Sequence, residues 1–354
     1  MKGNYKESRN RSISIIIVNY NGGALLHETV AAALSSSIPV EILISDNGST
    51  DGSLNTVYQA FGKDHRVHII SNGSNLGFSR ANNVALNKAK GDYILLLNPD
   101  CIIKSDTLEQ MINVLDSHPD AGMAGCLIRN PDGSEQPGCR RAIPTPWRAF
   151  IRVLHLNKMF PNNPRFRTFL LHQEPLPNQP TEIEAISGAF MLARRNAMNQ
   201  VGPLDENYFM HCEDIDWCLR FREAGWNILF VPNVDVLHYK GTCSKDRPIR
   251  VNYYMHNSMI YFYRKFFRLR YPSPLLVLVT GAAWTRFLTL TAKELIQRPF
   301  RKKHILAAMQ PTPLERRKPS PVVAYIGPER RVANRKVITS NSRPDELIIH
   351  RNKT

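Results

Sequence analysis

The feature that most constrains the fold is an apolar run at residues 93–97 that ends in Asn98, Pro99 and Asp100. A Lys-Gly-Asp turn precedes the run and the proline closes it, which is typical of a strand buried in a parallel sheet. In open α/β sheets, ligands bind beyond the carboxyl ends of such strands. The carboxylate of Asp100 is a hard oxygen donor suited to a divalent cation. A polar strand end, with Asn98 opening a turn before proline, explains the same residues, so this stretch alone leaves both interpretations open.

Strand and helix patterns alternate along the first hundred residues. Runs rich in β-branched residues predict further strands at 12–18, 40–45 and 67–71. Helical patterns separate the strands at 25–34, 54–61 and 80–89. The alternation predicts a doubly wound parallel sheet. Neither a dinucleotide-binding glycine fingerprint nor a P-loop is present in the sequence.

Beyond Asp100 the pattern continues with one interruption. We expect a helix at 106–117, a strand at 121–128 and a hairpin turn at 129–134. Residues 136–180 are rich in proline, arginine and aromatic residues with weak periodicity, which predicts a partly helical insertion acting as an acceptor loop or lid. Residues 183–194 are expected to form one strand, with Gly188 at a close backbone approach.

Three further polar positions are candidates for chemistry. Asp46 directly follows the second strand, where its carboxylate can accept hydrogen bonds from a pyrimidine imide or a ribose hydroxyl, or can cap the loop. Glu213, Asp214 and Asp216 open a helix that runs to residue 224. A helix N-terminus favours acids, but one of these carboxylates could act as a general base. His238 ends a strand, where a histidine is structural or completes a metal site.

Cysteine and charge patterns bound the compartment and the partners. The six cysteines form no CxxC pair and no zinc spacing with histidines, which predicts reduced thiols in a cytosolic protein. From residue 293 onward there are 15 Lys and Arg against 5 Asp and Glu, so about +10 of the net charge of +16 lies there. A basic tail suits a membrane surface, a nucleic acid or an acidic protein, or is simply solvated. No recognised nucleic-acid module accompanies it, so no nucleic-acid partner is predicted.

The C-terminal third interleaves aromatic and basic residues at 251–271, and an apolar stretch with Arg286 follows at 274–292. We favour an amphipathic helix on the inner face of the cell membrane. A helix packed within a soluble protein is the alternative, and a true span ranks third because an arginine at mid-span is costly.

Several motifs occur in one order along residues 12–244: Asn19-Tyr20-Asn21-Gly22, the loop from Asp46 to Ser53, Asn75-Leu76-Gly77-Phe78 with Ala81-Asn82-Asn83, Gly91 to Asp100, Glu213-Asp214-Ile215-Asp216, and His238 to Ser244. This ordered set resembles the family 2 inverting glycosyltransferases of the GT-A fold. The resemblance is nearest to the rhamnosyltransferase-like branch, which builds bacterial cell-surface polysaccharide. It implies a Rossmann-like, mostly parallel sheet flanked by helices, with a C-terminal helical extension and a flexible tail.

The resemblance implies roles for the matching positions. The nucleotide-sugar would be bound by Asn19, Tyr20, Asp46, Asn47, Asn75, Arg80, Asn98 and Asp100. Among these, Asp46 would hold the pyrimidine base, and Arg80 could meet the diphosphate.

The same resemblance implies a metal site and a base. Mg²⁺ or Mn²⁺ would be held by Asp100 and His238, while Asn98 stands where the family has a first aspartate and so removes one negative charge. Asp214 would be the catalytic base, with Glu213 the next candidate and Asp216 in a supporting role.

The expected organisation is a flexible N-terminus (1–11), a GT-A domain (12–245), a helical extension (246–303) and a disordered basic tail (304–354). The expected activity is transfer of a sugar, rhamnose from dTDP-rhamnose, to a hydroxyl of a cell-surface glycan or lipid-linked acceptor, by a cytoplasmic protein peripheral on the inner membrane face. A different hexose or N-acetylhexosamine donor, and a catalytically silent nucleotide-sugar-binding or scaffold protein, are the alternatives. The oligomeric state is not predicted.

Overall fold

The computed structural model describes residues 11–160, 163–241 and 247–308, except the side chains of Val153 and of residues 298–308. The chain divides into two compact units, Met1–Arg301 and Lys302–Thr354. All strands and nearly all helical residues of the described ranges lie in the first unit. The predicted N-terminal segment up to residue 10, Cys243, and the predicted tail from residue 309 onward lie outside the described residues.

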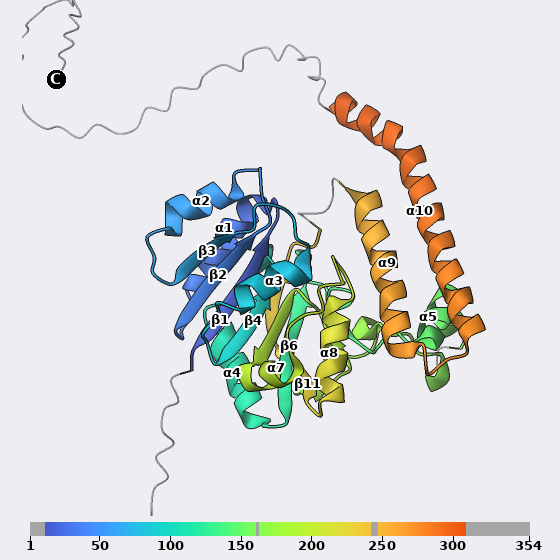
Figure 1. The fold of residues 1–354 in the computed structure, drawn as a ribbon, viewed down its shortest axis with the longest axis horizontal. Coiled ribbons are helices and arrows are strands. Elements are labelled where there is room, and N and C mark those ends of the chain that lie inside the picture. The colour runs from blue at the N-terminus through green and yellow to red at the C-terminus, as the bar shows by residue number, and fades with distance from the viewer. Residues whose placement is uncertain (1–10, 161–162, 242–246, 309–354) are drawn as a thin grey trace, which may run out of the picture. The chain divides into compact units, whose positions relative to one another are not determined.

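The first half of the sheet is parallel (Figure 1). It consists of β1 (Ile13–Asn19), β2 (Val40–Asp46), β3 (Val67–Ser71) and β4 (Tyr93–Leu97) in the order β3-β2-β1-β4. All five residues of β4 and all seven of β1 are buried. The strands predicted from the apolar runs, and their parallel arrangement, are therefore confirmed.

The second half of the sheet mixes directions. Beyond β4 the order continues β10-β6-β11-β5, with β10 (Phe190–Arg194) antiparallel to both β4 and β6 (Ala121–Arg129). The long strand β11 (Asn227–His238) runs parallel to β6 and pairs antiparallel with β5 (Cys101–Ile102) and β8 (Thr181–Glu182). The prediction of one strand over 183–194 is wrong, because the chain breaks at Ser187–Ala189 into β9 (Ala185–Ile186) and β10. β9 instead pairs with β7 (Arg140–Arg141) in a separate two-stranded sheet.

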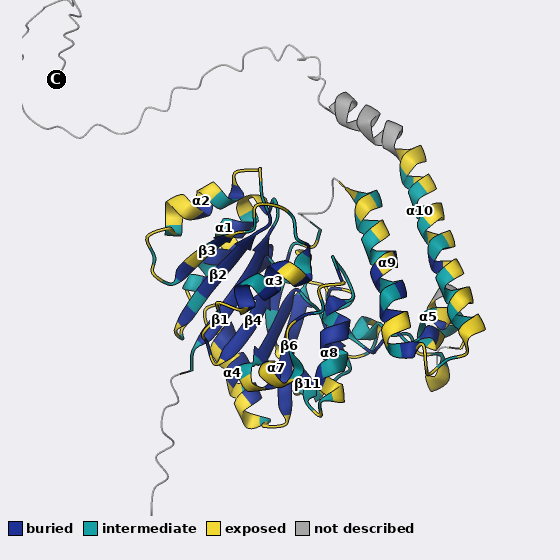
Figure 2. Ribbon diagram, viewed as in Figure 1, coloured by how far each residue is buried: buried dark blue, intermediate teal, exposed yellow. Residues whose placement is uncertain are grey.

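Helices cover both faces of the sheet, and the strands between them are mostly buried (Figure 2). One core lies under α1 (Gly23–Leu34), α2 (Ser53–Phe61) and α4 (Thr107–Ser117). The other lies under α3 (Phe78–Leu86), α7 (Arg195–Val201), α8 (Glu213–Glu223) and α9 (Pro248–Phe267). The helix α7 and the short strand β5 were not predicted, because seven and two residues are too short to show a period.

The predicted insertion is partly helical, as expected. It contains α5 (Pro146–Val153), α6 (Leu156–Met159) and two 3-10 turns, η1 (Pro164–Phe166) and η2 (Leu171–Gln173). The five cysteines in the described ranges are free thiols, in agreement with the prediction.

The apolar stretch near the C-terminus lies in a 36-residue helix, α10 (Ser273–Ala308). By length and composition its segment Ser273–Gln297 could cross a membrane, and only 6 % of its apolar window is buried. One side nevertheless packs on α9: Trp284 and Phe287 contact Tyr253, and Arg286 Nη1 lies 3.0 Å from Nε2 of the buried His256.

Candidate active site

The sheet topology places the polar ends of β1 and β4 side by side. β1 lies between β2 and β4. The strands after β1 are added first on the β2 side and then on the β4 side, so the strand order reverses between β1 and β4. In doubly wound folds, ligands bind at such a switch point. Asn19 ends β1, and Asn98, Pro99 and Asp100 follow β4. Thr29 of α1 fixes the turn by donating its hydroxyl to the carbonyl of Pro99 at 2.9 Å.

Strand β5 brings Asp100 and His238 together across 138 residues. Cys101 of β5 pairs with His238 of β11, and the N–H of Tyr239 donates to the carbonyl of Asp100 at 2.9 Å. As a result, His238 Nε2 lies 3.1 Å from Asp100 Oδ1 and 3.2 Å from Asn98 Nδ2. The three residues of the predicted metal motif are therefore neighbours.

The other ring nitrogen of His238 indicates the tautomer. Its Nδ1 lies 2.7 Å from Gln136 Oε1, while Nε2 of the same glutamine donates to Asn130 Oδ1 at 2.9 Å. Gln136 therefore presents an acceptor to the ring, so Nδ1 carries the proton. In the neutral ring, Nε2 then directs a lone pair toward the side of Asp100.

A lone pair and a carboxylate oxygen 3.1 Å apart suit a cation between or beside them. Mg²⁺ is commonly held by one or two carboxylates plus substrate phosphates, so Asp100 and His238 fit such an ion. Within the described ranges, no group of three or more His, Cys, Asp or Glu side chains is assembled to hold a metal. Beyond these two described residues, substrate phosphates and water are the usual further ligands of Mg²⁺.

The loops after β1 and β2 form a closed polar cluster. Nδ2 of Asn19 donates to Asp46 Oδ1 at 2.8 Å, and Asp46 Oδ2 accepts the N–H groups of Gly48 and Ser49 at 3.1 and 3.0 Å. Asn19 and Asp46 are buried, and these contacts hold the loop in place. Asp46 thus fulfils the loop-capping role that the sequence left open.

Asn47 and Asn75 belong to the same cluster. Nδ2 of Asn47 lies 3.3 Å from Asn75 Oδ1 and 3.2 Å from the carbonyl of Gly77. Asn47 Oδ1 accepts from Nδ2 of Asn72 at 3.0 Å, so this pair ties the loop after β2 to the loop after β3.

The side chains of two predicted nucleotide-site residues make contacts outside this cluster. The Tyr20 ring carries the guanidinium of Arg247 at 5.3 Å from its centroid, and its hydroxyl accepts from Arg247 Nη1 at 2.5 Å. Arg80 is exposed, and its Nε lies 3.7 Å from Glu206 Oε2. No contact joins Arg80 to Asn98 or Asp100 in the part of the chain that the structure describes.

Asp214 is held by three donors. Its Oδ2 accepts from Arg141 Nη2 and, at 3.0 Å, from the N–H of Gly188, while its Oδ1 accepts from the N–H of Ile215 at 2.8 Å. Burial alone would raise the pKa of Asp214, but the Arg141 guanidinium and the two N–H groups lower it below its usual value. Asp214 is therefore ionised at neutral pH. The neighbour of Gly188 is thus a side chain whose atoms would lie 3.4 Å or more from a Cβ at this position, so the predicted close backbone approach is not found there.

Glu213, the preceding residue, has the opposite environment. Its side chain is buried, and Oε2 has no hydrogen-bond partner among the described residues. Burial, with repulsion from Asp214 as the next cause, raises the pKa of Glu213 to about 8. At neutral pH Glu213 is therefore protonated and neutral, whereas Asp214 is ionised.

The turn between β9 and β10 contacts both Asp214 and the metal motif that contains Asp100. The N–H of Gly188 donates to Asp214, and the carbonyl of Ala189 accepts the N–H of Asn98 at 3.1 Å. The metal motif, through Asn98, and the acidic residues of α8, through Asp214, thus both contact the Gly188–Ala189 turn. Such an arrangement can hold a charged leaving group at one side and remove a proton at the other.

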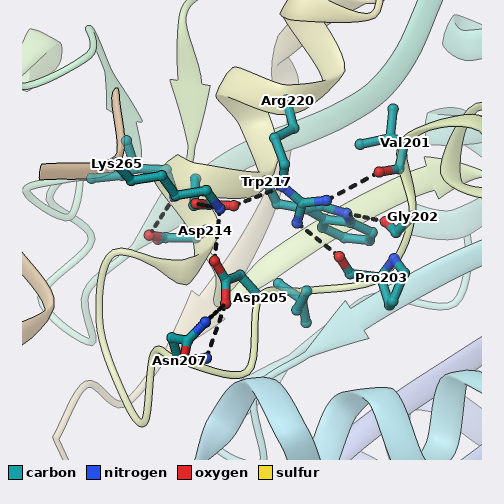
Figure 3. Close-up of polar contacts among 12 residues, drawn as sticks. Val201, Gly202, Pro203, Asp205, Asn207, Asp214, Trp217, Arg220 and Lys265 are labelled. Atoms are coloured by element: carbon teal, nitrogen blue, oxygen red, sulfur yellow. Dashed lines mark hydrogen bonds and ion pairs between the residues drawn. The ribbon is translucent and has the colours of Figure 1, made fainter. Parts of the chain in front are cut away.

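Asp216 has a structural role, because it joins Lys265 and Arg220, which Figure 3 shows together with Asp205. Its carboxylate is fully buried and accepts from Lys265 Nζ at 2.6 Å and from Arg220 Nε at 2.7 Å. Lys265 also donates to Asp205 at 2.7 Å. These contacts fasten the first turn of α8, which carries Glu213 and Asp214, to α9.

The sequence did not indicate three residues at the site: Gln136, Arg141 and Arg247. Gln136 and Arg141 lie in the weakly periodic insertion, and Arg247 precedes α9. The one sequence signal for these residues is the pair of adjacent arginines Arg140-Arg141 within the predicted, partly helical insertion.

Known structures share this architecture. A mannosyltransferase from Pyrobaculum calidifontis, solved with GDP-Man and Mn²⁺, matches 84 % of this chain and 81 % of its own with a TM-score of 0.51 at 16 % identity. GalNAc-T7, solved with UDP, GalNAc and Mn²⁺, matches 82 % of this chain and 58 % of its own with a TM-score of 0.50 at 17 % identity. The chain therefore shares the fold of these two enzymes, in agreement with the predicted GT-A fold.

Sequence comparison identifies the family. The model of "Glycosyl transferase family 2" matches residues 14–202, more than half of the chain. An N-acetylglucosaminyl-diphospho-decaprenol L-rhamnosyltransferase of Mycobacterium tuberculosis (strain ATCC 25618 / H37Rv) is 33 % identical over 240 residues, 64 % of this chain and 76 % of that protein. Rhamnosyltransferase WbbL of Escherichia coli (strain K12) is 33 % identical over 175 residues, 47 % of this chain and 62 % of that protein.

The chain belongs to glycosyltransferase family 2 and is a rhamnosyltransferase-like, nucleotide-sugar-dependent glycosyltransferase. The predicted family, branch and enzyme class are confirmed. This finding disfavours the alternative of a catalytically silent binding or scaffold protein.

Proposed function

We propose that this enzyme transfers rhamnose from dTDP-rhamnose to a hydroxyl of a lipid-linked or cell-surface glycan acceptor, with inversion at the anomeric carbon. The donor is suggested by the names of the two relatives, and the lipid-linked acceptor by the name of the mycobacterial one. The observation that carries the proposal is the approach of Asp214 and of the Asp100–His238 pair to the Gly188–Ala189 turn from two sides.

Each part of the site has a proposed task. Asp100 and His238 would hold Mg²⁺ or Mn²⁺, which when bound neutralises charge on the departing nucleoside diphosphate. The amide of Asn98 can donate to His238 Nε2 at 3.2 Å only while that nitrogen holds no metal, and Asn98 leaves the site with one carboxylate fewer than two aspartates would provide. The loops anchored by Asn19, Asp46, Asn47 and Asn75 shape the nucleoside pocket next to Tyr20. Arg80 serves the diphosphate from the exposed edge.

Asp214 acts as the general base. It is ionised at neutral pH, and Arg141 and Gly188 fix its orientation. The acceptor hydroxyl gives its proton to Asp214 as its oxygen attacks the anomeric carbon and the bond to the diphosphate breaks. One displacement of this kind inverts the centre without a covalent enzyme intermediate. Glu213 keeps its proton and is the alternative base only at alkaline pH.

The enzyme acts at the cytoplasmic face of the membrane, where α10 lies on the lipid surface. The support is the exposed apolar side of α10 together with the packing of its other side on α9.

A panel of donors tests the function. Purified full-length protein is offered dTDP-rhamnose, UDP-glucose, UDP-galactose, UDP-N-acetylglucosamine and GDP-mannose, each with and without Mn²⁺, with a prenyl-diphosphate-linked N-acetylglucosamine acceptor. We expect Mn²⁺-dependent transfer from dTDP-rhamnose to give a product of inverted configuration. Transfer from another donor alone would overturn the rhamnose assignment.

A further inference from the structure

We infer that the insertion between β6 and β9 carries a second membrane-docking element, an aromatic ridge that places the lipid surface beside the catalytic base. The aromatic ridge consists of Trp147, Phe150, Leu154, Met159 and Phe160, from α5, α6 and the residues that flank α6. The inference rests on the proposed action on a lipid-linked acceptor.

The ridge is exposed, and its three aromatic rings are linked by ring contacts, partly through Phe166. Its side chains are between 43 % (Phe150) and 67 % (Met159) exposed. The Trp147 and Phe150 rings stack with centroids 5.7 Å apart, and Phe166 contacts both Trp147 and Phe160, at 6.2 and 4.8 Å. Single exposed apolar residues are ordinary on protein surfaces, whereas a contiguous patch marks an interaction site.

The ridge is mounted firmly on the catalytic domain. Arg148 donates to both carboxylate oxygens of Glu184, at 2.6 and 3.0 Å, and the N–H of Ile143 donates to the same carboxylate at 2.6 Å. Ile151 on the inner side of α5 is buried. The apolar residues of the ridge therefore point outward because the inner side of α5 is already packed, and not because the segment is unfolded.

Charge favours an anionic lipid surface as the partner. Residues 146–167 contain five Lys and Arg and no Asp or Glu. Of these, Arg152, Lys158, Arg165 and Arg167 are exposed around the ridge. Aromatic side chains flanked by Lys and Arg are the composition of helices that lie in the membrane interface.

Arg152 of α5 lies near Arg286 of α10, which belongs to the side of α10 that packs on α9. Burial and the nearby Arg286 of α10 lower the pKa of Arg152 of α5, so these two cations lie close together. On α10, Val277, Leu288 and Leu295 are exposed, and their spacing of 11 and 7 residues puts them on one side of the helix.

The ridge is also close to the chemistry. Arg141, which holds Asp214, precedes the first residue of α5 by five positions, a reach of at most about 18 Å. A bilayer docked on the ridge would therefore lie near the base, where a sugar on a lipid carrier could enter.

Vesicle binding tests the inference without donor or acceptor. Full-length protein is sedimented with vesicles of phosphatidylcholine containing 30 % phosphatidylglycerol and with vesicles of phosphatidylcholine alone. The double variant Trp147→Ser/Phe150→Ser is compared with Tyr58→Ser, which removes an aromatic ring that is 67 % exposed on α2. We expect the ridge variant to bind the anionic vesicles at least tenfold more weakly, with an unchanged melting temperature, and Tyr58→Ser to bind like the wild type.

Three results would overturn the inference. The first is wild-type vesicle binding by the ridge variant, which would leave docking to α10 alone. The second is a concentration-dependent dimer in sedimentation velocity that the ridge variant abolishes, which would assign the ridge to a second copy of the chain. The third is an equal loss of transfer to a vesicle-borne and to a short-chain, water-soluble acceptor, because docking predicts a rise in KM for the vesicle-borne acceptor only. If the wild type transfers rhamnose to neither acceptor, the proposed function fails, while the vesicle-binding result still decides the inference.

Discussion

At the scale of single residues, two adjacent carboxylic acids of the site differ in protonation because their surroundings differ. Glu213 and Asp214 are adjacent carboxylic acids, yet one lacks a partner for Oε2 among the described residues and the other accepts three hydrogen bonds. The sequence could indicate both acids, but it could not rank them, because Arg141 approaches from 73 positions away. Which of two adjacent acids has the lower pKa depends on tertiary contacts, and a local sequence pattern does not contain these contacts.

The raised pKa of Glu213 predicts a pH dependence of stability. Its ordinary pKa is 4.5 and its folded value is about 8, so between these values the folded protein binds a proton that the unfolded chain has released. This stabilisation is complete below pH 4.5 and is lost as the pH rises through 8. We expect the melting temperature of the wild type to fall from pH 5 to pH 8.5 by more than that of Glu213→Gln, measured by calorimetry. Parallel curves for the two proteins would contradict the assignment.

Gln136 is expected to act on the metal through His238. It accepts from His238 Nδ1 and so fixes the tautomer that directs the Nε2 lone pair toward Asp100. Removing such an orienting partner usually lowers metal affinity about 10- to 100-fold. We predict that Gln136→Ala weakens Mn²⁺ binding by this factor in titrations followed by electron paramagnetic resonance. Gln110→Ala, on the outer surface of α4, is the matched control and should bind Mn²⁺ like the wild type.

At the scale of elements, the four parallel strands could be predicted from the sequence, whereas the shortest strands could not. The four parallel strands follow from apolar runs that are complete within each strand. The break of 183–194 into β9 and β10 could not be predicted, because it depends on pairing with β7 and on the contacts of the Gly188–Ala189 turn. β5 spans two residues and exists because β11 pairs with it, yet it is the element that joins Asp100 to His238.

The fastening of α8 to α9 predicts a large stability effect at Asp216. This buried carboxylate pairs with Lys265 and Arg220, so Asp216→Asn removes the negative charge and one of the two acceptor oxygens that face these cations, while Lys265 keeps its contact with Asp205. Breaking a buried pair typically costs about 3 to 5 kcal/mol, and the partial exposure of both cations places the expected cost at or below about 3 kcal/mol. Urea unfolding measures this cost. Asp64→Asn, which disrupts a surface pair with Arg66, serves as the control and should change the free energy of unfolding far less.

At the scale of the whole molecule, the order of the motifs predicted more than any one of them. Each polar loop alone was compatible with a cap, and Asp46 is indeed engaged as one. The sheet collects the loop ends at one edge, so residues that are far apart in sequence become one site. The insertion contributed Gln136 and Arg141, which the sequence did not single out because their segment has no regular period.

The measurement that tests the account most directly is donor binding and transfer by Asp214→Asn. The change keeps the shape of the side chain and removes the base, so the affinity for dTDP-rhamnose with Mn²⁺, measured by calorimetry, should stay within about twofold of the wild type. General-base catalysis contributes about 10²- to 10⁴-fold, so kcat for transfer should fall by at least about 100-fold. Transfer by Asp214→Asn at a rate near that of the wild type would contradict the assignment of Asp214 as the base.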